Sequence, residues 1–549
     1  MTALLTDNLP LLAGAPNGIK KLRELILELA VRGKLVPQDP NDEPASELLK
    51  RIAEEKARLE ANGKTQKQKS FKKIGDDEKS FDLPERWAWQ RFGQVFSLEY
   101  GDNLPANKRS NTGEYPVYGS NGIVGTHNTY FVGSPCIVVG RKGSAGALNL
   151  CHSSGCCVTD VAYYCVPPSV FSLDYVFKLF HTLGLDSLGK GIKPGLNRNE
   201  AYALVVAIPP LAEQHRIVAK VDELMALCDR LEGQQADAES AHAQLAQALL
   251  GSLTQATDAE DFAASWQRLA EHFHTLFTTE PSIDALKQTL LQLAVMGKLV
   301  PQDPSDEPAS ELLKQIAEEK AQLVAQGKIK KQTLLADSLE KNKPFEVPEA
   351  WEWCRVSDLI SIKHGYAFSS AYFCESASSY VLTTPGSFFE AGGFRDRGDR
   401  TKYYCGPVDQ EFALHAGDLI VAMTEQAAGL LGSTAFVPKD EKIYLHNQRL
   451  GKLIFDSETV FSGYIFHYFN GAYFRSCIAD SSTGMKVKHT SPGKIGAVFF
   501  PLPPLAEQHR IVAKVDQLMA LCDQLKTRLT QARQLNEQLA TALVEQAVA

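Results

Sequence analysis

Hydrophobic residues recur at helical spacing in two segments near the start of the chain. Residues 19–35 (IKKLRELILELAVRGKL) place Ile, Leu and Val three and four positions apart, and Gly33 stands where a helix C-cap is expected. A second helix is predicted at about 44–61, because Pro44 suits a first helical turn and the apolar positions after it keep the same period.

Two much longer helices are predicted further along, each beginning after a pair of prolines. Their apolar positions alternate four and three residues apart, which is the pattern of a coiled-coil seam. The first seam comprises Ile217, Val221, Leu224, Cys228, Leu231, Gln235, Ala238, His242, Leu245 and Leu249, and the second comprises Ile511, Val515, Leu518, Cys522, Leu525, Leu529, Ala532, Asn536, Leu539 and Leu543. We predict that these helices, about 55 Å long at 1.5 Å per residue, pair with each other. The alternative is that each packs on its own domain or on another chain.

Between the helices, the pattern changes to short β-like runs broken by glycine and proline. The runs at 135–139 and 418–423 are examples. Each of these stretches, roughly 90–208 and 354–502, follows a proline and two tryptophans and ends in an apolar run into two prolines. We expect each stretch to form a compact domain of strands and helices.

The helical segments are duplicated, whereas the β-rich segments are not. Residues 29–57 and 293–321 differ at three of 29 positions, and residues 209–231 and 503–525 differ at two of 23. The two β-rich stretches look unlike each other. We call the duplicated helical segments the frame and the two β-rich stretches the inserts. The duplicated frame offers two equivalent docking surfaces, and the two different inserts offer two different recognition surfaces. The chain is therefore predicted to be a bipartite recognition protein.

The predicted fold class is therefore α+β. Two compact recognition domains are separated by two long helices that pair as an antiparallel coiled coil, and the whole has a pseudo-two-fold internal repeat. The predicted segments are an N-terminal helical element (1–80), domain 1 (81–210), the first long helix (211–256), a central linker with the second helical element (257–344), domain 2 (345–502) and the second long helix (503–549).

Charge and composition narrow the functional class. The net charge of −8 argues against strong binding of nucleic acid by the isolated chain. The acid is concentrated in the frame, because 90–208 holds nine Lys/Arg against seven Asp/Glu and 354–502 holds 14 of each. No apolar run approaches the ~20 residues of a membrane span, and the first residues lack the basic region of a signal peptide. Eleven cysteines without framework spacing fit a reducing cytoplasm.

Motifs for catalysis are missing from the sequence. There is no Asn/Asp-Pro-Pro-Tyr/Phe run of an amino-methyltransferase, no His-Glu-x-x-His, and the glycine-rich run at 140–146 lacks the Gly-Lys-Ser/Thr ending of a phosphate loop. One cluster has a metal-like composition: Cys151, His152, Cys156, Cys157 and Cys165. Its spacing matches no zinc pattern, so we interpret these cysteines as buried free thiols and predict no metal site.

Glycine-rich loops with basic and amide side chains are the candidates for contacting DNA. Arginine and lysine bind phosphate or guanine, asparagine can pair with adenine, and glycine allows close approach. In domain 1 the candidates are Lys108, Arg109, Tyr118, Ser120, Asn121, Arg141, Lys142, Ser144, Lys190, Lys193, Asn197 and Arg198. In domain 2 they are Lys363, Tyr366, Phe368, Arg395, Arg397, Arg400, Thr424, Gln426, Asn447, Arg449, Lys486, Lys488 and Thr490. For each residue the alternative is a solvated surface loop, and for Arg395 to Arg400 it is ion pairing with neighbouring acids.

Several of these motifs resemble the specificity (S) subunits of Type I restriction–modification enzymes. The resemblance is carried by four motifs: the Ile/Leu-Pro-Pro-Leu-Ala-Glu-Gln-His-Arg-Ile-Val element at 208–218 and 502–512, the Leu-Pro-Glu-x-Trp-x-Trp entry at 83–89, the Tyr-Pro-Val-Tyr-Gly-Ser-Asn-Gly loop at 115–122 and the Ser-Thr-Gly-Met-Lys segment at 482–486. It covers nearly the whole chain.

The resemblance implies a noncatalytic subunit with two target recognition domains, each binding one half of an interrupted site in double-stranded DNA. Two methyltransferase (M) subunits, which use S-adenosylmethionine, would dock on the frame, and restriction (R) subunits, which use ATP and Mg²⁺, would join through them. The chain itself would need no cofactor. Two alternatives remain: a fused enzyme with unrecognised motifs, and a protein–protein scaffold without a DNA role, which the net charge favours.

Overall fold

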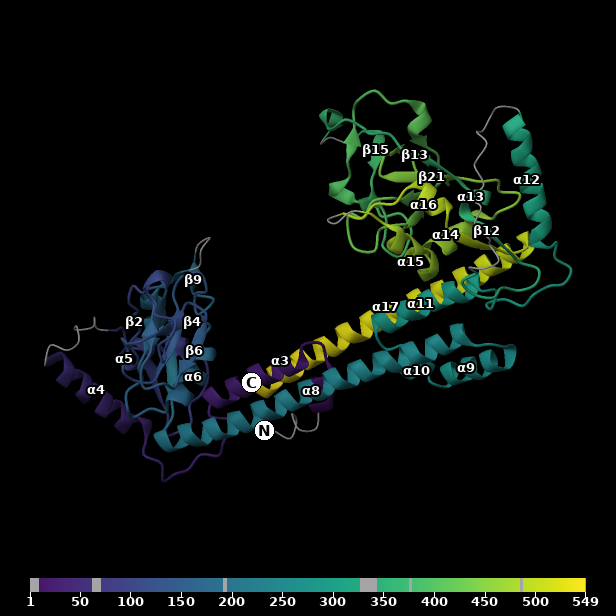
Figure 1. The fold of residues 1–549 in the computed structure, drawn as a ribbon. Coiled ribbons are helices and arrows are strands. Elements are labelled where there is room, and N and C mark those ends of the chain that lie inside the picture. The colour runs from purple at the N-terminus through teal and green to yellow at the C-terminus, as the bar shows by residue number, and fades with distance from the viewer. Residues whose placement is uncertain are drawn as a thin grey trace. The chain divides into compact units, whose positions relative to one another are not determined.

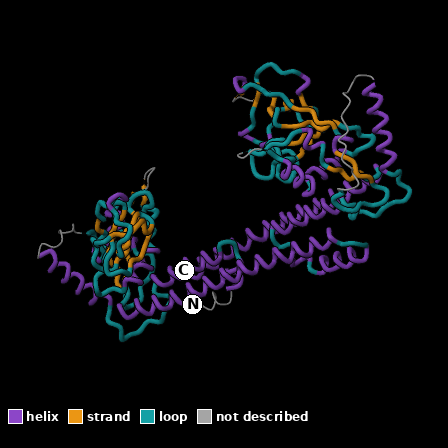
Figure 2. Tube along the Cα trace, in the orientation of Figure 1, coloured by secondary structure: helices purple, strands orange, loops and turns teal. Residues whose placement is uncertain are grey.

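The computed structural model describes residues 9–61, 71–190, 195–325, 343–374, 378–483 and 487–548. The chain divides into two compact units: unit 1 comprises Met1–Glu239 with Gln531–Ala549, and unit 2 comprises Ser240–Thr530. Each unit combines helices of the frame (Figure 1) with one β-rich domain in which the strands gather (Figure 2). The predicted α+β class, with two domains and a long helix between them in the chain, is confirmed.

The short helices of the frame lie where the hydrophobic period predicts them. In unit 1, α3 spans Gly18–Val31 and α4 spans Ala45–Ala61. Gly33 after α3 has a φ of 68°, a left-handed conformation that favours glycine and ends the helix. In unit 2 the repeat places α11 at Glu280–Val295, Gly297 with a φ of 69° and α12 at Ala309–Ala325. The other short frame helices are α2 (Leu9–Gly14), α9 (Ala259–Glu271) and α10 (Phe273–Leu276).

Domain 1 is built on a four-stranded antiparallel sheet in the order β2-β8-β5-β6. These strands are β2 (Glu99–Tyr100), β5 (Cys136–Gly140), β6 (Leu148–Cys151) and β8 (Ala162–Cys165). A second sheet holds β3 (Tyr115–Gly119) between antiparallel β4 (Gly122–His127) and parallel β7 (Cys157–Val158). The pairs β1 (Ala88–Arg91) with β11 (Val205–Ile208) and β9 (Gly189–Lys190) with β10 (Gly195–Leu196) complete it, along with α5 (Phe92–Val95), α6 (Leu173–His181) and α7 (Arg198–Ala203).

Domain 2 has the same central sheet, although its sequence looks different. The order β13-β21-β18-β19 is again antiparallel throughout, with β13 (Ser361–His364), β18 (Leu419–Ala422), β19 (Thr434–Phe436) and β21 (Leu450–Ile454). The larger second sheet contains β14 (Phe373–Cys374), β16 (Tyr403–Tyr404), β15 (Tyr380–Thr383), β20 (Ile443–His446) and β17 (Ala413–Leu414), in that order. The pair β12 (Glu352–Arg355) and β22 (Phe499–Leu502) matches β1 and β11, and α13 (Val356–Leu359), α14 (Ser462–Asn470), α15 (Ala472–Ser481) and α16 (Pro492–Gly496) follow.

One glycine in each domain shows how closely the two sheets correspond. A Cβ on Gly101 would lie 2.3 Å from the carbonyl oxygen of Thr159, and a Cβ on Gly365 would lie 2.2 Å from that of Asn447. Only glycine allows the chain that follows β2 to pass so close to the turn after β7, or the chain that follows β13 to pass so close to the turn after β20. The structure therefore reveals a shared backbone that the sequence comparison of the two inserts did not predict.

A buried carboxylate joins each domain to the start of its long helix. The indole N–H of Trp87 donates to Glu213 Oε2 (2.9 Å), and the amide of Gln38 donates to Glu213 Oε1 (2.6 Å). Both distances recur in unit 2, where Trp351 and Gln302 donate to Glu507. Burial raises the pKa of both glutamates, and the donated hydrogen bonds oppose that shift.

A second repeated contact lies one helical turn further along. Arg216 donates two hydrogen bonds to the buried carboxylate of Asp42 (2.6 and 3.3 Å), and Arg510 does the same to Asp306 (2.6 and 3.1 Å). Each pair ties the loop between two short helices to the long helix. The frame is thus duplicated in its contacts as well as in its sequence.

The long helices α8 (Leu211–Gln255) and α17 (Leu505–Val548) both pass from one unit to the other. Each unit therefore holds the first part of one helix and the last part of the other. In unit 1, α3 contacts both: Arg23 pairs with Asp229 of α8 (2.5 Å), and Lys21 donates to Thr541 of α17 (2.7 Å). In unit 2, Lys287 of α11 pairs with Asp523 of α17, and Lys298 donates to the carbonyl of Ala256 just beyond α8 (2.8 Å).

The predicted coiled-coil register is right only for the first part of each long helix. The predicted seam residues from Ile217 to Cys228 are largely buried, as are Ile511, Val515 and Cys522, but Leu245 and Leu539 are about half exposed. The buried residues there are the next ones in the chain, Ala246 and Ala540. The buried face moves by one residue because the last part of α8 packs in the hydrophobic cluster of α11, and the last part of α17 packs in that of α3. Neither helix continues one straight seam along its whole length.

Two further findings concern cysteines and membranes. The cysteine count predicted no disulfide framework, yet Cys374 and Cys405 form a disulfide that joins β14 to the end of β16. Within the described ranges, no helix combines the length and apolar character needed to cross a bilayer.

The Arg216–Asp42 contact yields a stability prediction. Replacing Arg216 with Ala leaves the Asp42 carboxylate, whose side chain is 7% exposed, without its cation, and we expect local unfolding of residues 40–52 to become easier by about 2 kcal/mol. Native-state hydrogen exchange measures this locally, which suits a protein of several domains. The control K220A removes only an exposed pair with Glu223 and should change the same value by less than about 0.5 kcal/mol. Equal effects of R216A and K220A would contradict the assigned role.

Candidate nucleic-acid interface

Backbone hydrogen bonds bring three loops of domain 1 together at one end of the central sheet. The N–H of Arg141, after β5, donates to the carbonyl of Val161 in the turn after β7 (2.9 Å). The N–H of Leu196 in β10 donates to the carbonyl of Arg141 (2.9 Å). Candidate residues that are up to 57 positions apart in the sequence, Arg141 and Arg198, thus belong to one surface.

Tyr100 organises the two arginines of this surface. Its ring lies 4.7 Å from the guanidinium carbon of Arg141 and 4.7 Å from that of Arg198. Each arginine also donates to a carbonyl, Arg141 to Asp160 (3.0 Å) and Arg198 to Leu98 (3.3 Å). A guanidinium has five N–H groups, so both retain donors for a phosphate or a guanine. Tyr100 is 47% exposed and was missed by the sequence analysis, since it lies between the acidic residues Glu99 and Asp102 and its arginine partners come from distant segments.

The small polar candidates join the neighbouring turns. The hydroxyl of Ser120, after β3, accepts a hydrogen bond from the N–H of Ser144 in the loop after β5 (3.3 Å). Asn121 and Lys142 are exposed beside them. Asn197 is one of the DNA-contact candidates, but its side-chain oxygen accepts from the N–H of Asn199 and caps α7 (3.0 Å), which leaves only its amide N–H₂ as a donor.

The remaining candidates of domain 1 lie elsewhere. Lys108 is exposed, whereas Arg109 donates to the carbonyls of Leu104 (3.2 Å) and Val124 (3.0 Å) and so supports its own loop. Tyr118 is 6% exposed because its side chain points from β3 into the hydrophobic core, so it does not form part of this surface. Lys190 belongs to β9, but its side chain, like all of Lys193, lies outside the described residues.

Domain 2 brings the corresponding loops together with the same backbone hydrogen bonds. The N–H of Met423 donates to the carbonyl of Arg449 (2.9 Å), and the N–H of Thr490 donates to the carbonyl of Met423 (3.0 Å). This brings five candidates together: Thr424 and Asn447, which are buried, and Gln426, Arg449 and Thr490, which reach the surface. Lys488 adjoins them, because Glu425 N–H donates to its carbonyl (2.9 Å). Gln426, Arg449 and Lys488 are exposed, and Lys486 lies outside the described residues.

Buried polar groups fix the shape of this surface. Thr424 Oγ1 is hydrogen-bonded to Nδ1 of His489 (3.2 Å), a residue that the sequence analysis did not select. Asn447 accepts from the N–H of Arg449 (3.0 Å). Burial lowers the pKa of neighbouring His446 to about 4, so its ring is neutral at pH 7 and can donate from Nε2 to the carbonyl of Leu450 (3.1 Å).

An aromatic group adjoins the same loops. Tyr366 is 52% exposed, and its ring lies 5.2 Å from the rings of Phe368 and Phe412. Lys363 pairs with Glu411 (2.7 Å) and lies over Phe412, so part of its charge is satisfied within the domain. Phe368, whose ring contacts that of Tyr366, is buried in the core and, like Tyr118, does not form part of the exposed surface.

The three arginines between 395 and 400 occupy a separate loop. Arg395 pairs with Glu390 (2.6 Å) and lies over the ring of Phe389, and Arg397 donates to the hydroxyl of Thr384 (3.3 Å). Arg400 is exposed. The intramolecular pairing considered for this run is thus present for Arg395.

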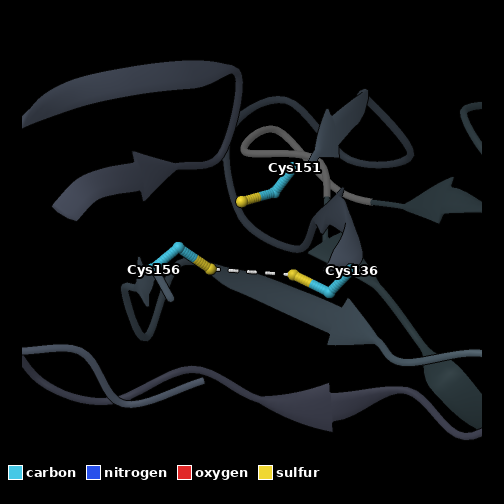
Figure 3. Close-up of side chains that lie close together, drawn as sticks. All are labelled: Cys136, Cys151 and Cys156. Carbon is cyan, nitrogen blue, oxygen red and sulfur yellow. Dashed lines mark hydrogen bonds between the residues drawn. The ribbon is translucent and has the colours of Figure 1, made fainter. Parts of the chain in front are cut away.

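Figure 3 shows a group of thiols that the sequence analysis identified only in part. The sulfur atoms of Cys136, Cys151 and Cys156 lie within 4.8 Å of one another. Cys157 and Cys165 are buried separately, and His152 is at the surface, 3.6 Å from Asp174. Cys136 was missed because it precedes the cluster by 15 residues and joins it only through the pairing of β5 with β6.

Comparison with known proteins gives consistent matches over the whole chain. A family model for the Type I restriction modification DNA specificity domain matches twice, at residues 84–239 and 348–533. The Type I restriction enzyme EcoAI specificity subunit of Escherichia coli is 37% identical over 564 residues, which cover 97% of this chain and 94% of that protein. The EcoEI specificity subunit, also of Escherichia coli, is 36% identical over 573 residues, with the same two coverages.

Among solved structures, the HsdS subunit from Thermoanaerobacter tengcongensis is 17% identical, with a TM-score of 0.38 over 86% of this chain and 98% of that chain. A structure from work on assembly of the type I R-M system gives 16% identity and a TM-score of 0.48 over 85% and 99%.

The arrangement of Arg141 and Arg198 around Tyr100 yields a binding prediction. We expect R141A and R198A each to weaken binding of double-stranded DNA by about tenfold, because each removes a positioned guanidinium from the surface. Dissociation constants are to be compared at one fixed salt concentration. The control R230A removes an exposed arginine of α8 and should leave the constant within about twofold. An equal loss in R230A would mean that only net charge matters.

Proposed function

Because this chain belongs to the family of Type I restriction–modification specificity subunits, we propose that it is the noncatalytic subunit that selects the DNA sequence for such a complex. Domain 1 and domain 2 act as two target recognition domains, and each binds one half of an interrupted site in double-stranded DNA. The complex acts in the cytoplasm.

The observation that carries this proposal is the combination of an identical support with different loops. Glu213 and Glu507 hold the two domains through the same pair of donors at the same distances. The central sheets have the same strand order, yet the polar side chains at their ends differ: a half-buried arginine pair around Tyr100 in domain 1, and the exposed Gln426, Arg449 and Lys488 in domain 2. A shared scaffold with different polar side chains suits recognition of two different base sequences.

The duplicated frame also supports the choice of partners. Residues 29–57 and 293–321 present nearly the same side chains twice, so two copies of one partner can bind in equivalent ways. We propose that these partners are two M subunits, which use S-adenosylmethionine to methylate adenine, and that R subunits using ATP and Mg²⁺ join through them. The excess of acid in the frame leaves much of the phosphate neutralisation to these partners.

Two other functions make different predictions. A fused enzyme would modify or cut DNA as a purified single chain, and a protein–protein scaffold would protect no DNA sequence even with its partners present. The family membership and the missing catalytic motifs favour the specificity subunit over both.

Methylation mapping tests the proposal directly. We expect that expression of this chain with the M subunit of its system, in a host without its own methylation, gives one interrupted motif with methylated adenines. Genome-wide methylation sequencing detects the motif and both half-sites. Methylation by the chain alone would support the fused enzyme, and a soluble complex without a motif would contradict the proposal.

The separation of loops from frame gives a second prediction. Exchanging residues 90–208 for those of a relative should change one half-site only, because the loops of domain 1 belong to unit 1. Adding about one helical turn (about four residues, ~6 Å) to both long helices, after 236 and after 530, should lengthen only the gap by about two base pairs. Both are measured by methylation sequencing. A change in both half-sites from the exchange would contradict the model of two independent recognition domains.

A further inference from the structure

Three cysteines from three separate segments meet inside domain 1. Cys136 begins β5 and pairs directly with Cys151 at the end of β6. Cys156 comes from the segment before β7, where it forms an isolated bridge with Val132. The sulfur atoms of Cys136 and Cys156 are 3.7 Å apart, and all three sulfur atoms lie within 4.8 Å of one another (Figure 3).

The surroundings of these thiols are closed to solvent. Each of the three cysteines is at most 1% exposed, and they share a small core with Val132, Val138, Val158 and Ala162. The side chain of Tyr118, which also belongs to this core, contacts Cys151. Three polarisable sulfur atoms aimed at one another in an apolar core form a preorganised set of soft ligands.

We propose that Cys136, Cys151 and Cys156 bind one zinc ion as a structural site. Zinc–sulfur bonds are about 2.3 Å long, so two sulfurs on a tetrahedral zinc ion are about 3.8 Å apart, close to the separation of Cys136 and Cys156. Each thiol loses its proton on binding, so that Zn²⁺ and three thiols give a complex with a charge of −1 and three released protons. Structural zinc is four-coordinate, and we assign the fourth position to the hydroxyl of Tyr118, which contacts Cys151 and would keep its proton.

The position of the site explains what the ion would do. The strands β5 and β6 form a hairpin whose turn carries Arg141, Lys142 and Ser144, and the cysteines lie at the open end of that hairpin. Zinc would hold this end to the segment before β7, and so to the second sheet. The ion therefore stabilises the support of the recognition loops and takes no part in contacting DNA.

Domain 2 has no thiols at the corresponding positions. The register of its strands places Asp418, Val437 and Tyr444 where domain 1 has Cys136, Cys151 and Cys156. There, Asp418 pairs with Lys452 instead (2.6 Å). The proposal therefore specifies one zinc ion per chain and not two, despite the internal repeat.

The first test is the metal content of the full-length chain. Protein produced with zinc in the medium and purified in reducing buffer, without a metal-binding tag, should contain about one zinc per chain by mass spectrometry of the elements. Replacement of the zinc by Cd²⁺ should give an ultraviolet thiolate-to-cadmium charge-transfer band. These measurements need no variant, so a misfolded mutant cannot confuse them. Protein that holds no zinc and gives no band with Cd²⁺ would overturn the proposal, and so would a Cys136–Cys156 disulfide in protein kept reduced.

Matched variants then assign the site. C136S and C156S should each lose the zinc and the cadmium band. C157S and C165A change two other buried cysteines of domain 1, whose sulfurs lie outside the group of three, and should keep the full zinc content. Circular dichroism checks that each variant is folded. Zinc that persists in folded C136S and C156S would place the ion elsewhere and overturn the assignment.

Discussion

A buried carboxylate at the start of each long helix is the constraint on which the rest of the structure depends. Glu213 and Glu507 each accept one hydrogen bond from the tryptophan that opens a domain and one from the loop after a short helix. Because an unpaired buried carboxylate is costly, both donors must be in place, which fixes domain, loop and helix relative to one another within the unit. The two domains differ in sequence, but each is attached to its long helix through an equivalent glutamate.

The central sheets extend this principle from the frame to the domains. Their strands keep the same order and the same close passage of a glycine over a turn, while the loops differ in length and in side chains. Backbone hydrogen bonds hold those loops, such as Arg141 to Val161 and Met423 to Arg449, and they impose no particular side chain. The surface can therefore change its chemistry without losing its shape.

The sequence predicted what periodicity and repetition can encode. The short helices, the left-handed glycine after α3 and the α+β class follow from local pattern, since each depends on neighbours in the chain. The common sheet was invisible because main-chain pairing leaves no signature in side chains. Tyr100 and Cys136 were missed because their partners come from distant segments, and the register at Leu245 and Leu539 was wrong because α11 and α3 offer a competing apolar face. The residues predicted to contact DNA remain predictions, although most of them gather at one end of each sheet.

The assignment of residues 531–548 to unit 1 has a consequence for the order of synthesis on the ribosome. Ala540 and Ala547 fill the core around α3, and Lys34 donates to the carbonyl of Val548 (3.0 Å). These groups are made only after all of unit 2, which at 5–20 residues per second means a delay of roughly 15–60 s after Glu239. During that interval the apolar side of α3 is not yet covered by the last part of α17. The nascent chain therefore exposes an apolar surface to which a chaperone can bind.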